Sequence, residues 1–238
     1  MNLYSLFIGK KKKLALLIDP DKTSLTNAVT LSKEAMEQQF HFVFIGGSII
    51  SESIDNYIKT IKSSCSLPII LFPGSYFQLS KFADGLLLLS LISGRNPEYL
   101  IGQHVIAAPL IKKYGLATIP TGYILINGGS VSSTEYMSNT KAIPALKTDI
   151  IKATALAGEM LGLKLIYLEA GSGAKNPVSE QIISEIRKTV SIPIIVGGGI
   201  SDPKQLKLMF NTGADIAVIG TAIEKDKKMI KQFAKVLI

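Results

Sequence analysis

The unit that decides the fold is Ile194-Ile195-Val196-Gly197-Gly198-Gly199-Ile200, a short apolar run that ends in glycines. Apolar runs of the same kind recur along the chain. The eight runs are 14–18, 42–45, 69–72, 86–90, 123–126, 163–168, 194–196 and 216–219. Short runs that are apolar nearly throughout are typical of parallel strands covered on both faces.

Longer amphipathic segments separate these runs and predict helices. The clearest lie at 24–39, 145–161, 179–190 and 204–210. Eight strands that alternate with helices predict a (β/α)8 TIM barrel, an α/β fold, with an open doubly wound sheet as the alternative. No linker composition interrupts the series in 238 residues. We therefore expect residues 1–238 to form a single domain.

The barrel is predicted to be irregular after its third strand. Only Pro73 to Gly85 separates the third run from the fourth, which leaves room for little more than a two-turn helix. We expect the third helix to be shortened or replaced, and its absence would leave an apolar slot on the flank of the barrel.

Composition narrows the class of protein. Charged residues make up 18% and hydrophobic residues 47% of the chain, which excludes extended disorder. The net charge is +8, but only Arg95 and Arg187 are arginines and tryptophan is absent, which argues against nucleic-acid binding. The surplus of lysine instead favours anionic substrates such as phosphates, and it favours peripheral contact with anionic membrane surfaces.

Location follows from three further features of the sequence. No apolar stretch approaches the roughly 18–20 residues that cross a bilayer. The N-terminal residues place their charges after their apolar part, the reverse of a secretory signal. Cys65 is the only cysteine, so an internal disulfide or a Cys-x-x-Cys metal site is ruled out. We expect a soluble, cytoplasmic protein.

Glycines follow the last two predicted strands, where barrels commonly bind phosphate. Gly198 and Gly199 follow the seventh strand, and Gly220 and Thr221 follow the eighth. Glycines let backbone N–H groups approach an anion closely, and a following helix N-terminus favours negative charge. Tight βα turns alone would also explain these glycines. We expect a phosphorylated ligand here.

The sixth predicted strand carries the strongest catalytic candidate. Side chains alternate along a strand, so Leu165, Tyr167 and Glu169 share one face, while Lys164 lies on the other. If that face is interior, a phenol and a carboxylate point together into the mouth, where Glu169 can act as a general base towards a hydroxyl group. The alternative is that Glu169 pairs with a lysine at the rim. Lys164 is a poor Schiff-base candidate because it faces outward.

Two residues are candidate ligands for a hard cation. Asp19 ends the first strand, and Ser48 follows the second. Mg²⁺ takes one or two carboxylates and completes its shell with water and substrate phosphates. Asp21 is either a second ligand or the N-cap of the first helix. Neither histidine is expected to take part, since His41 enters the second strand and His104 lies on a helix.

Several of these segments together resemble one enzyme family. They are Leu17-Ile18-Asp19-Pro20-Asp21-Lys22, Phe44-Ile45-Gly46-Gly47-Ser48, Tyr167-Leu168-Glu169-Ala170-Gly171-Ser172-Gly173, Ile195-Val196-Gly197-Gly198-Gly199-Ile200 and Ile219-Gly220-Thr221. In this order they look like the geranylgeranylglyceryl phosphate synthase family, which includes the heptaprenylglyceryl phosphate synthases. The resemblance covers nearly the whole chain and implies a barrel whose third helix is replaced.

The resemblance implies that a prenyl group passes from a long-chain prenyl diphosphate to the 3-hydroxyl of sn-glycerol 1-phosphate, forming an ether and releasing diphosphate. Residue by residue, it assigns glycerol phosphate binding to Tyr167, Leu168, Glu169, Ala170, Gly171, Ser172, Gly173, Gly198, Gly199, Gly220 and Thr221. It makes Glu169 the base and Asp19 and Ser48 the Mg²⁺ site. It also implies a homo-oligomer, a dimer or a hexamer.

One position departs from the family pattern. Leu17 stands where some relatives carry a lysine that reaches glycerol phosphate, so Lys22 or Lys175 is expected to contribute the positive charge. We favour geranylgeranyl diphosphate as the donor over a longer prenyl diphosphate. The residues expected to line the prenyl slot are Phe72, Tyr76, Phe77, Leu86, Leu87, Leu88, Leu89, Leu91 and Tyr99.

Two other functions stay open at the level of the sequence. Another phosphate-binding barrel, such as a sugar-phosphate isomerase, would need a paired acid and base, and only Glu169 and Asp19 stand out. A catalytically idle phosphate- or phospholipid-binding protein is less consistent with a candidate base and a candidate metal ligand at one mouth.

Overall fold

The computed structural model describes residues 3–47, 50 and 53–237. Its eight strands pair in parallel and in sequence order, and β8 closes onto β1. The strands are β1 (Lys13–Ile18), β2 (Phe42–Ile45), β3 (Ile69–Leu71), β4 (Gly85–Leu91), β5 (Thr118–Leu125), β6 (Leu165–Glu169), β7 (Ile194–Gly197) and β8 (Ile216–Ile219). The predicted TIM barrel is therefore confirmed, and the open sheet is excluded.

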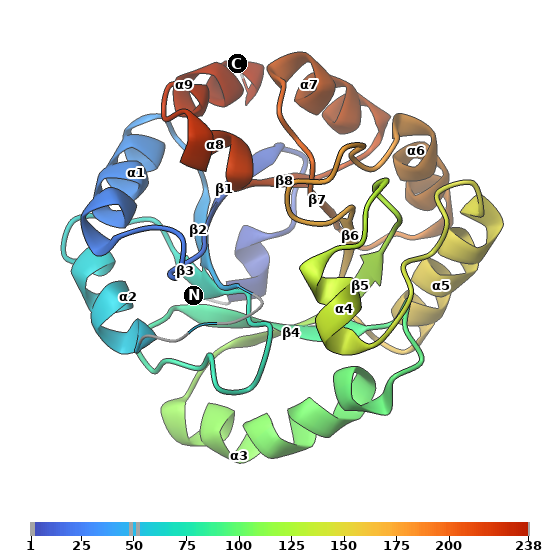
Figure 1. Ribbon diagram of the computed structural model, residues 1–238, viewed down its shortest axis with the longest axis horizontal. Coiled ribbons are helices and arrows are strands. Elements are labelled where there is room, and N and C mark those ends of the chain that lie inside the picture. The colour runs from blue at the N-terminus through green and yellow to red at the C-terminus, as the bar shows by residue number, and fades with distance from the viewer. Residues whose placement is uncertain (1–2, 48–49, 51–52, 238) are drawn as a thin grey trace.

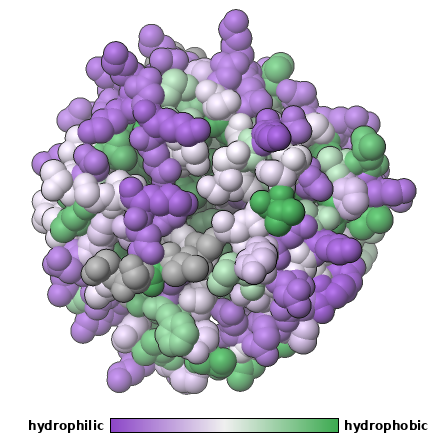
Figure 2. Space-filling view, viewed as in Figure 1, coloured by the Kyte–Doolittle hydropathy of each residue, from purple (hydrophilic) through white to green (hydrophobic). Residues whose placement is uncertain are grey.

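Most of the helices surround the strands as an outer ring (Figure 1). The helices are α1 (Leu25–Glu37), α2 (Ile54–Lys62), α3 (Gln103–Tyr114), α4 (Ser133–Ser138), α5 (Thr148–Met160), α6 (Glu180–Thr189), α7 (Pro203–Thr212), α8 (Thr221–Lys225) and α9 (Met229–Ala234). Of these, α4 lies inside the ring, over β5 (Figure 1). Shorter turns are the 3-10 helices η1 (Leu3–Leu6) and η3 (Lys235–Leu237) and a π-helix, η2 (Glu98–Gly102), which leads into α3. Seen down the barrel, hydrophilic residues cover most of this face (Figure 2).

The helix that would follow β3 in a regular barrel is absent, as the sequence predicts, and α3 follows β4. Residues 72–84 run from β3 to β4 without a helix, and in Figure 1 they pass between α2 and α3. The chain is too short there to form a covering helix and still return to the start of β4. This gap leaves one flank of the barrel to be closed by the loop and by α3.

Two hydrophobic cores hold the barrel together. The outer core lies between strands and helices, and it contains Ile166 and Leu168 of β6. The inner core fills the barrel and contains Leu165 and Tyr167 of the same strand. The alternation predicted for the sixth strand is therefore confirmed. Phe7, fully buried, closes the lower end of the inner core against Phe42.

The fifth strand is longer than the sequence predicts. We expected it to begin at Tyr123, but β5 begins at Thr118. The first half of β5 was not predicted, because it contains Pro120 and Gly122, and both residue types are disfavoured inside strands. Pro120 cannot donate a hydrogen bond, but its carbonyl oxygen still accepts one from the Lys164 N–H at 2.8 Å, just before β6.

Candidate active site

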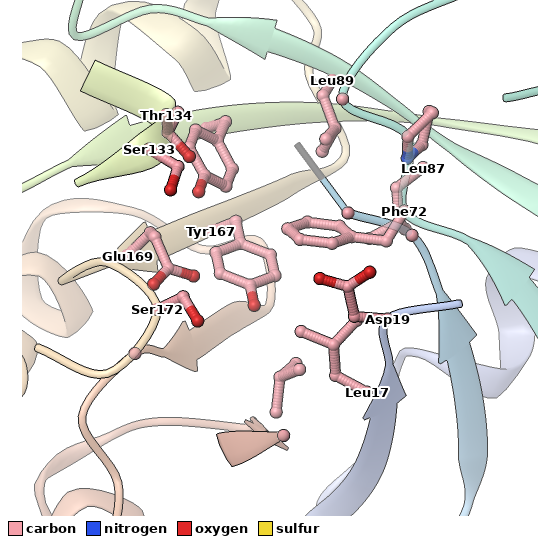
Figure 3. A pocket seen from close by; sticks show the side chains of 18 of the residues that line it. Leu17, Asp19, Phe72, Leu87, Leu89, Ser133, Thr134, Tyr167, Glu169 and Ser172 are labelled. Atoms are coloured by element: carbon pink, nitrogen blue, oxygen red, sulfur yellow. The ribbon is translucent and has the colours of Figure 1, made fainter. Parts of the chain in front are cut away.

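The carboxyl ends of the strands enclose a cavity of about 530 Å³. Residues from the first, second, sixth, seventh and eighth strand ends all line it, together with the loop after β3 and the inner face of α3. The strand ends that carry the predicted site residues therefore meet at one mouth, as the sequence predicts. Figure 3 shows Glu169 and Asp19 on opposite sides of the Tyr167 ring, both directed into the cavity.

Glu169 is the most perturbed acid of this mouth. Its side chain is 6% exposed, and the N–H of Gly171 donates to Oε1 at 2.7 Å. Burial raises the pKa of Glu169 to about 7, although the Gly171 hydrogen bond opposes the shift. A carboxylate with a pKa close to neutral can accept a proton and release it again, as a general base must. A lysine partner at the rim, the alternative considered above, is not found among the described residues.

Tyr167 lies beside this carboxylate with its phenol in the cavity. Its side chain is fully buried, and its hydroxyl interacts with the neighbouring Glu169 carboxylate. Burial raises the pKa of the phenol well above its usual value, and the Glu169 charge adds to the shift. The protonated hydroxyl can donate to the carboxylate or to a ligand that binds beside it, and it can also accept a hydrogen bond.

The ring of Tyr167 is fixed by aromatic neighbours. Phe72 stacks on it with ring centroids 5.1 Å apart, and the Tyr123 ring lies 5.3 Å away. A Cβ atom at Gly197 would overlap the Tyr167 hydroxyl and approach Glu169 Oε2 to 2.9 Å. The glycine that ends β7 therefore makes the space in which the phenol and the carboxylate lie.

The predicted phosphate cradle is assembled on the same side. Gly198, Gly199, Gly220 and Thr221 all line the cavity, and the Ser172 and Thr221 hydroxyl oxygens are 3.5 Å apart. Gly198 has a φ of +81°, and a Cβ there would overlap Glu169 Oε1. This glycine therefore serves both the turn and the close packing of the base.

Asp19 faces the cradle from β1. Its Oδ2 lies 2.7 Å from Lys22 Nζ, and its Oδ1 accepts the Asp21 N–H at 3.2 Å. The ion pair raises the pKa of Lys22. The N-cap of α1 is Ser24, whose side chain accepts from the Asn27 N–H, so the capping role considered for Asp21 is wrong.

The donors at this mouth are compatible with Mg²⁺ but do not form a complete protein site. No group of three or more His, Cys, Asp or Glu residues is suited to a metal ion in the described part of the chain. A single hard carboxylate beside a phosphate cradle fits the preference of Mg²⁺ for one or two protein ligands plus phosphate oxygens. Ser48, the other predicted ligand, lies outside the described residues.

Three predicted binding residues do not reach the cavity. Leu168 and Ala170 are buried in the outer core beneath the helices, because alternation along β6 turns them away from the barrel interior. Gly171 does not line the cavity either, and it acts on Glu169 through its N–H. The expectation that all seven residues from Tyr167 to Gly173 contact a ligand stays a prediction, but the side chains of Leu168 and Ala170 face away from the cavity.

The apolar slot continues from the mouth towards the gap after β3. The predicted lining residues found in the cavity are Phe72, Tyr76, Leu86, Leu87, Leu88, Leu89, Leu91 and Tyr99. The prediction is wrong for Phe77, because this residue is 79% exposed and lies outside the cavity. Tyr76 stacks on Phe77 with ring centroids 4.1 Å apart, so the pair forms an outer edge of the slot.

Sequence reasoning missed several residues of the cavity wall. His104 lines the cavity, although its place on a helix predicts only a structural role, and its buried Nδ1 has no partner among the described residues. Ser133 and Thr134 of α4 also line it. The capping pattern around them, in which Ser132 accepts the Glu135 N–H, could have placed a helix over the fifth strand end. Nothing in the sequence marks His104, because its neighbours come from distant segments.

Comparison with protein families gives one full-length match, the PcrB family, over residues 8–237. The chain is 48% identical over 237 residues to a geranylgeranylglyceryl phosphate synthase of Chitinophaga pinensis, covering 98% of this chain and 94% of the relative. It is 42% identical over 219 residues to the protein of that name from Pyrococcus furiosus, covering 91% and 86%.

Solved structures agree with these sequence relatives. The crystal structure of (S)-3-O-geranylgeranylglyceryl phosphate synthase from Thermoplasma acidophilum, in complex with its substrate sn-glycerol-1-phosphate, matches with a TM-score of 0.94 at 29% identity. The match covers 100% of this chain and 98% of that one. The Thermoplasma volcanium enzyme matches with a TM-score of 0.92 at 30% identity, covering 100% and 96%.

Proposed function

Because the chain belongs to the PcrB family, we propose that it is a geranylgeranylglyceryl phosphate synthase that transfers a geranylgeranyl group to the 3-hydroxyl of sn-glycerol 1-phosphate. The observation that carries this proposal is the placement of one buried carboxylate, Glu169, against the glycine cradle of β7 and β8. A cradle for phosphate and a base for a hydroxyl group, a few ångströms apart, suit a small phosphorylated alcohol.

In this reaction the glycerol phosphate is held by its phosphate and activated at its hydroxyl. The backbone at Gly198, Gly199 and Gly220 and the hydroxyls of Ser172 and Thr221 would hold the phosphate group. Glu169 would take the proton of the 3-hydroxyl, and the Tyr167 hydroxyl would orient that alcohol. Fixing both substrates with the reacting atoms about 3–3.5 Å apart replaces a bimolecular encounter by an oriented one.

The oxygen of the 3-hydroxyl forms a bond to C1 of the prenyl group, and the bond from C1 to the diphosphate oxygen breaks. The diphosphate leaves with that electron pair, and the hydroxyl proton passes to the Glu169 carboxylate. Asp19 would hold Mg²⁺, which when bound stabilises the charge on the diphosphate. Lys22 and Lys175 also line the mouth and supply positive charge there.

The apolar slot supports a long hydrocarbon donor. Residues 86–89 of β4, Tyr76 of the loop and Ala107 of α3 line it, and each buried CH₂ group contributes roughly 0.8 kcal/mol. The names of the relatives favour geranylgeranyl diphosphate over a heptaprenyl donor.

A cytoplasmic location and assembly into a homo-oligomer stay predictions from the sequence. None of the helices in the described part of the chain has the length and apolarity to cross a membrane.

The test is a direct assay with labelled sn-glycerol 1-phosphate, Mg²⁺ and farnesyl, geranylgeranyl or heptaprenyl diphosphate. We expect a butanol-extractable ether product, formed fastest from the geranylgeranyl donor, and little product from sn-glycerol 3-phosphate. Absence of product with every donor would contradict the proposal. Faster turnover of heptaprenyl diphosphate would correct the donor and leave the reaction type in place.

A further inference from the structure

The helix α3 is unusual because little of it is buried against the barrel. Ala107 is the only one of its twelve residues that is buried. Its inner face, with His104, Ala107 and Ile111, lines the cavity. A helix that separates a cavity from solvent is expected to have a polar outer face, since surface helices carry charged and polar residues there.

The outer face of η2 and α3 is apolar instead. Ile101 is 59% exposed, Val105 65% and Ile106 53%, and Pro109 is exposed on the same side of the helix. In Figure 2 hydrophobic side chains gather at the lower edge of the molecule, over α3. Contiguous exposed apolar residues of this kind mark a contact with another body.

The opposite edge of the slot has the same character. Phe77, on the loop that replaces the third helix, is also exposed, and it stacks on Tyr76, which lines the cavity. The loop and α3 are neighbours in Figure 1. The slot is therefore bordered by exposed apolar side chains on both of its edges.

Lysines lie at the C-terminal end of this apolar helix face and on the loop. Lys112 and Lys113 form the exposed last turn of α3, and Lys81 is exposed on the loop. None of the three forms an ion pair with a described carboxylate. Exposed apolar residues flanked by unneutralised lysines are the pattern of a surface that binds anionic bilayers.

We propose that Phe77, Ile101, Val105 and Ile106, with Lys81, Lys112 and Lys113, form a docking surface for a bilayer that contains anionic lipids. The prenyl chain would then pass between the bilayer and the slot without crossing water. The choice of a lipid partner rests on the proposed function, because a donor and a product with long hydrocarbon chains both partition into membranes.

The experiment is sedimentation of the full chain with large vesicles, without substrates. The vesicles contain phosphatidylcholine alone or phosphatidylcholine with phosphatidylglycerol. The test variant is Val105→Glu/Ile106→Glu. The matched control is Met160→Glu/Leu161→Glu, which makes the same charge change at two side chains that are more than three-quarters exposed at the end of α5.

We expect the wild type and the control to bind the anionic vesicles, more weakly at high salt, and the test variant to bind about tenfold less. Equal binding by the test variant and the wild type, or no binding by the wild type, would overturn the proposal. A smaller particle mass for the test variant than for the wild type in light scattering would also overturn it, because the face would then join copies of the chain.

Activity in detergent micelles separates this inference from the proposed function. Val105 and Ile106 face away from the cavity, so ether formation from micellar donor should be unchanged in the test variant. If the wild type makes no ether in micelles, the proposed function fails, while vesicle binding still decides whether the surface docks on lipid.

Discussion

The substitution Glu169→Gln tests the central residue of the site through two independent properties. Gln has nearly the same shape, and its Oε1 can still accept the Gly171 N–H that donates to Glu169 at 2.7 Å. The change therefore removes the charge and the basicity while leaving the packing in place. It should abolish most turnover and at the same time stabilise the fold at alkaline pH.

The magnitude of the stability effect follows from the pKa of Glu169. Burial raises this pKa from 4.5 to about 7, so the folded state binds the proton more tightly than the unfolded state. The stabilisation is fully present below the unfolded pKa, near 4.5, and is lost as pH rises through about 7. At about 1.4 kcal/mol per pKa unit the loss is about 3 kcal/mol. The Gln variant does not lose it.

We therefore expect Glu169→Gln to match the wild type in free energy of unfolding near pH 4. Near pH 8 it should exceed the wild type by up to about 3 kcal/mol, or about 6–12 °C in melting temperature for a chain of this size. Urea and thermal unfolding at both pH values measure this difference. Glu37→Gln, at the exposed end of α1, is the control and should show no such pH-dependent gain.

Kinetics give the second readout of the same substitution. In the wild type kcat/KM should rise with pH to a plateau, with a midpoint near 7, because only the carboxylate form accepts the proton. In the variant turnover should fall by about 10²–10⁴-fold and lose this acidic limb. Turnover close to that of the wild type would refute the role of base. Equal stability of the two proteins at pH 8 would refute the argument from burial.

Three further substitutions test other parts of the site. Gly198→Ala should raise the KM for glycerol phosphate about tenfold or more, because the new Cβ would overlap Glu169. The control is Gly162→Ala, at a glycine with a similar positive φ and no atom within 4 Å of the new Cβ. This control should show only the cost of backbone strain, about 1–2 kcal/mol. Asp19→Asn should raise the Mg²⁺ concentration for half-maximal rate about tenfold, and an unchanged titration would remove Asp19 from the proposed metal site. Ala107→Phe should narrow the slot at α3 and lower the rate with geranylgeranyl diphosphate more than with farnesyl diphosphate, and equal losses with both donors would place the hydrocarbon elsewhere.

The barrel could be predicted from the sequence because its information is local. Each strand is a short apolar run bounded by turn residues, and the predicted 42–45 and 216–219 agree with β2 and β8 to the residue. The absence of a full helix between β3 and β4 could be predicted from chain length alone, since the segment from Pro73 to Gly85 has room for little more than a two-turn helix. Prediction was wrong at the start of β5, where pairing with neighbouring strands outweighs the unfavourable Pro120 and Gly122.

The candidate site was predictable for the same reason only in part. Period two along β6 placed Tyr167 and Glu169 on one face, and a closed barrel brings all strand ends to one mouth. The same periodicity, applied to the whole Tyr167 to Gly173 block, would have excluded Leu168. The block was retained because a motif read as a unit does not distinguish side chains that face a ligand from those that pack behind it.

The sequence alone determined the strands, the closed barrel, and which end of the barrel carries the glycines and acids. Hydrophobic period, segment length and turn residues are properties of residues that are neighbours in sequence. Tertiary structure alone decided that Glu169 is buried enough for a pKa of about 7, that Lys22 neutralises Asp19, and that α3 turns one apolar face to the slot and another to solvent. Burial, ion pairing and exposure depend on segments that meet only after folding, and a sequence pattern holds no distances between them.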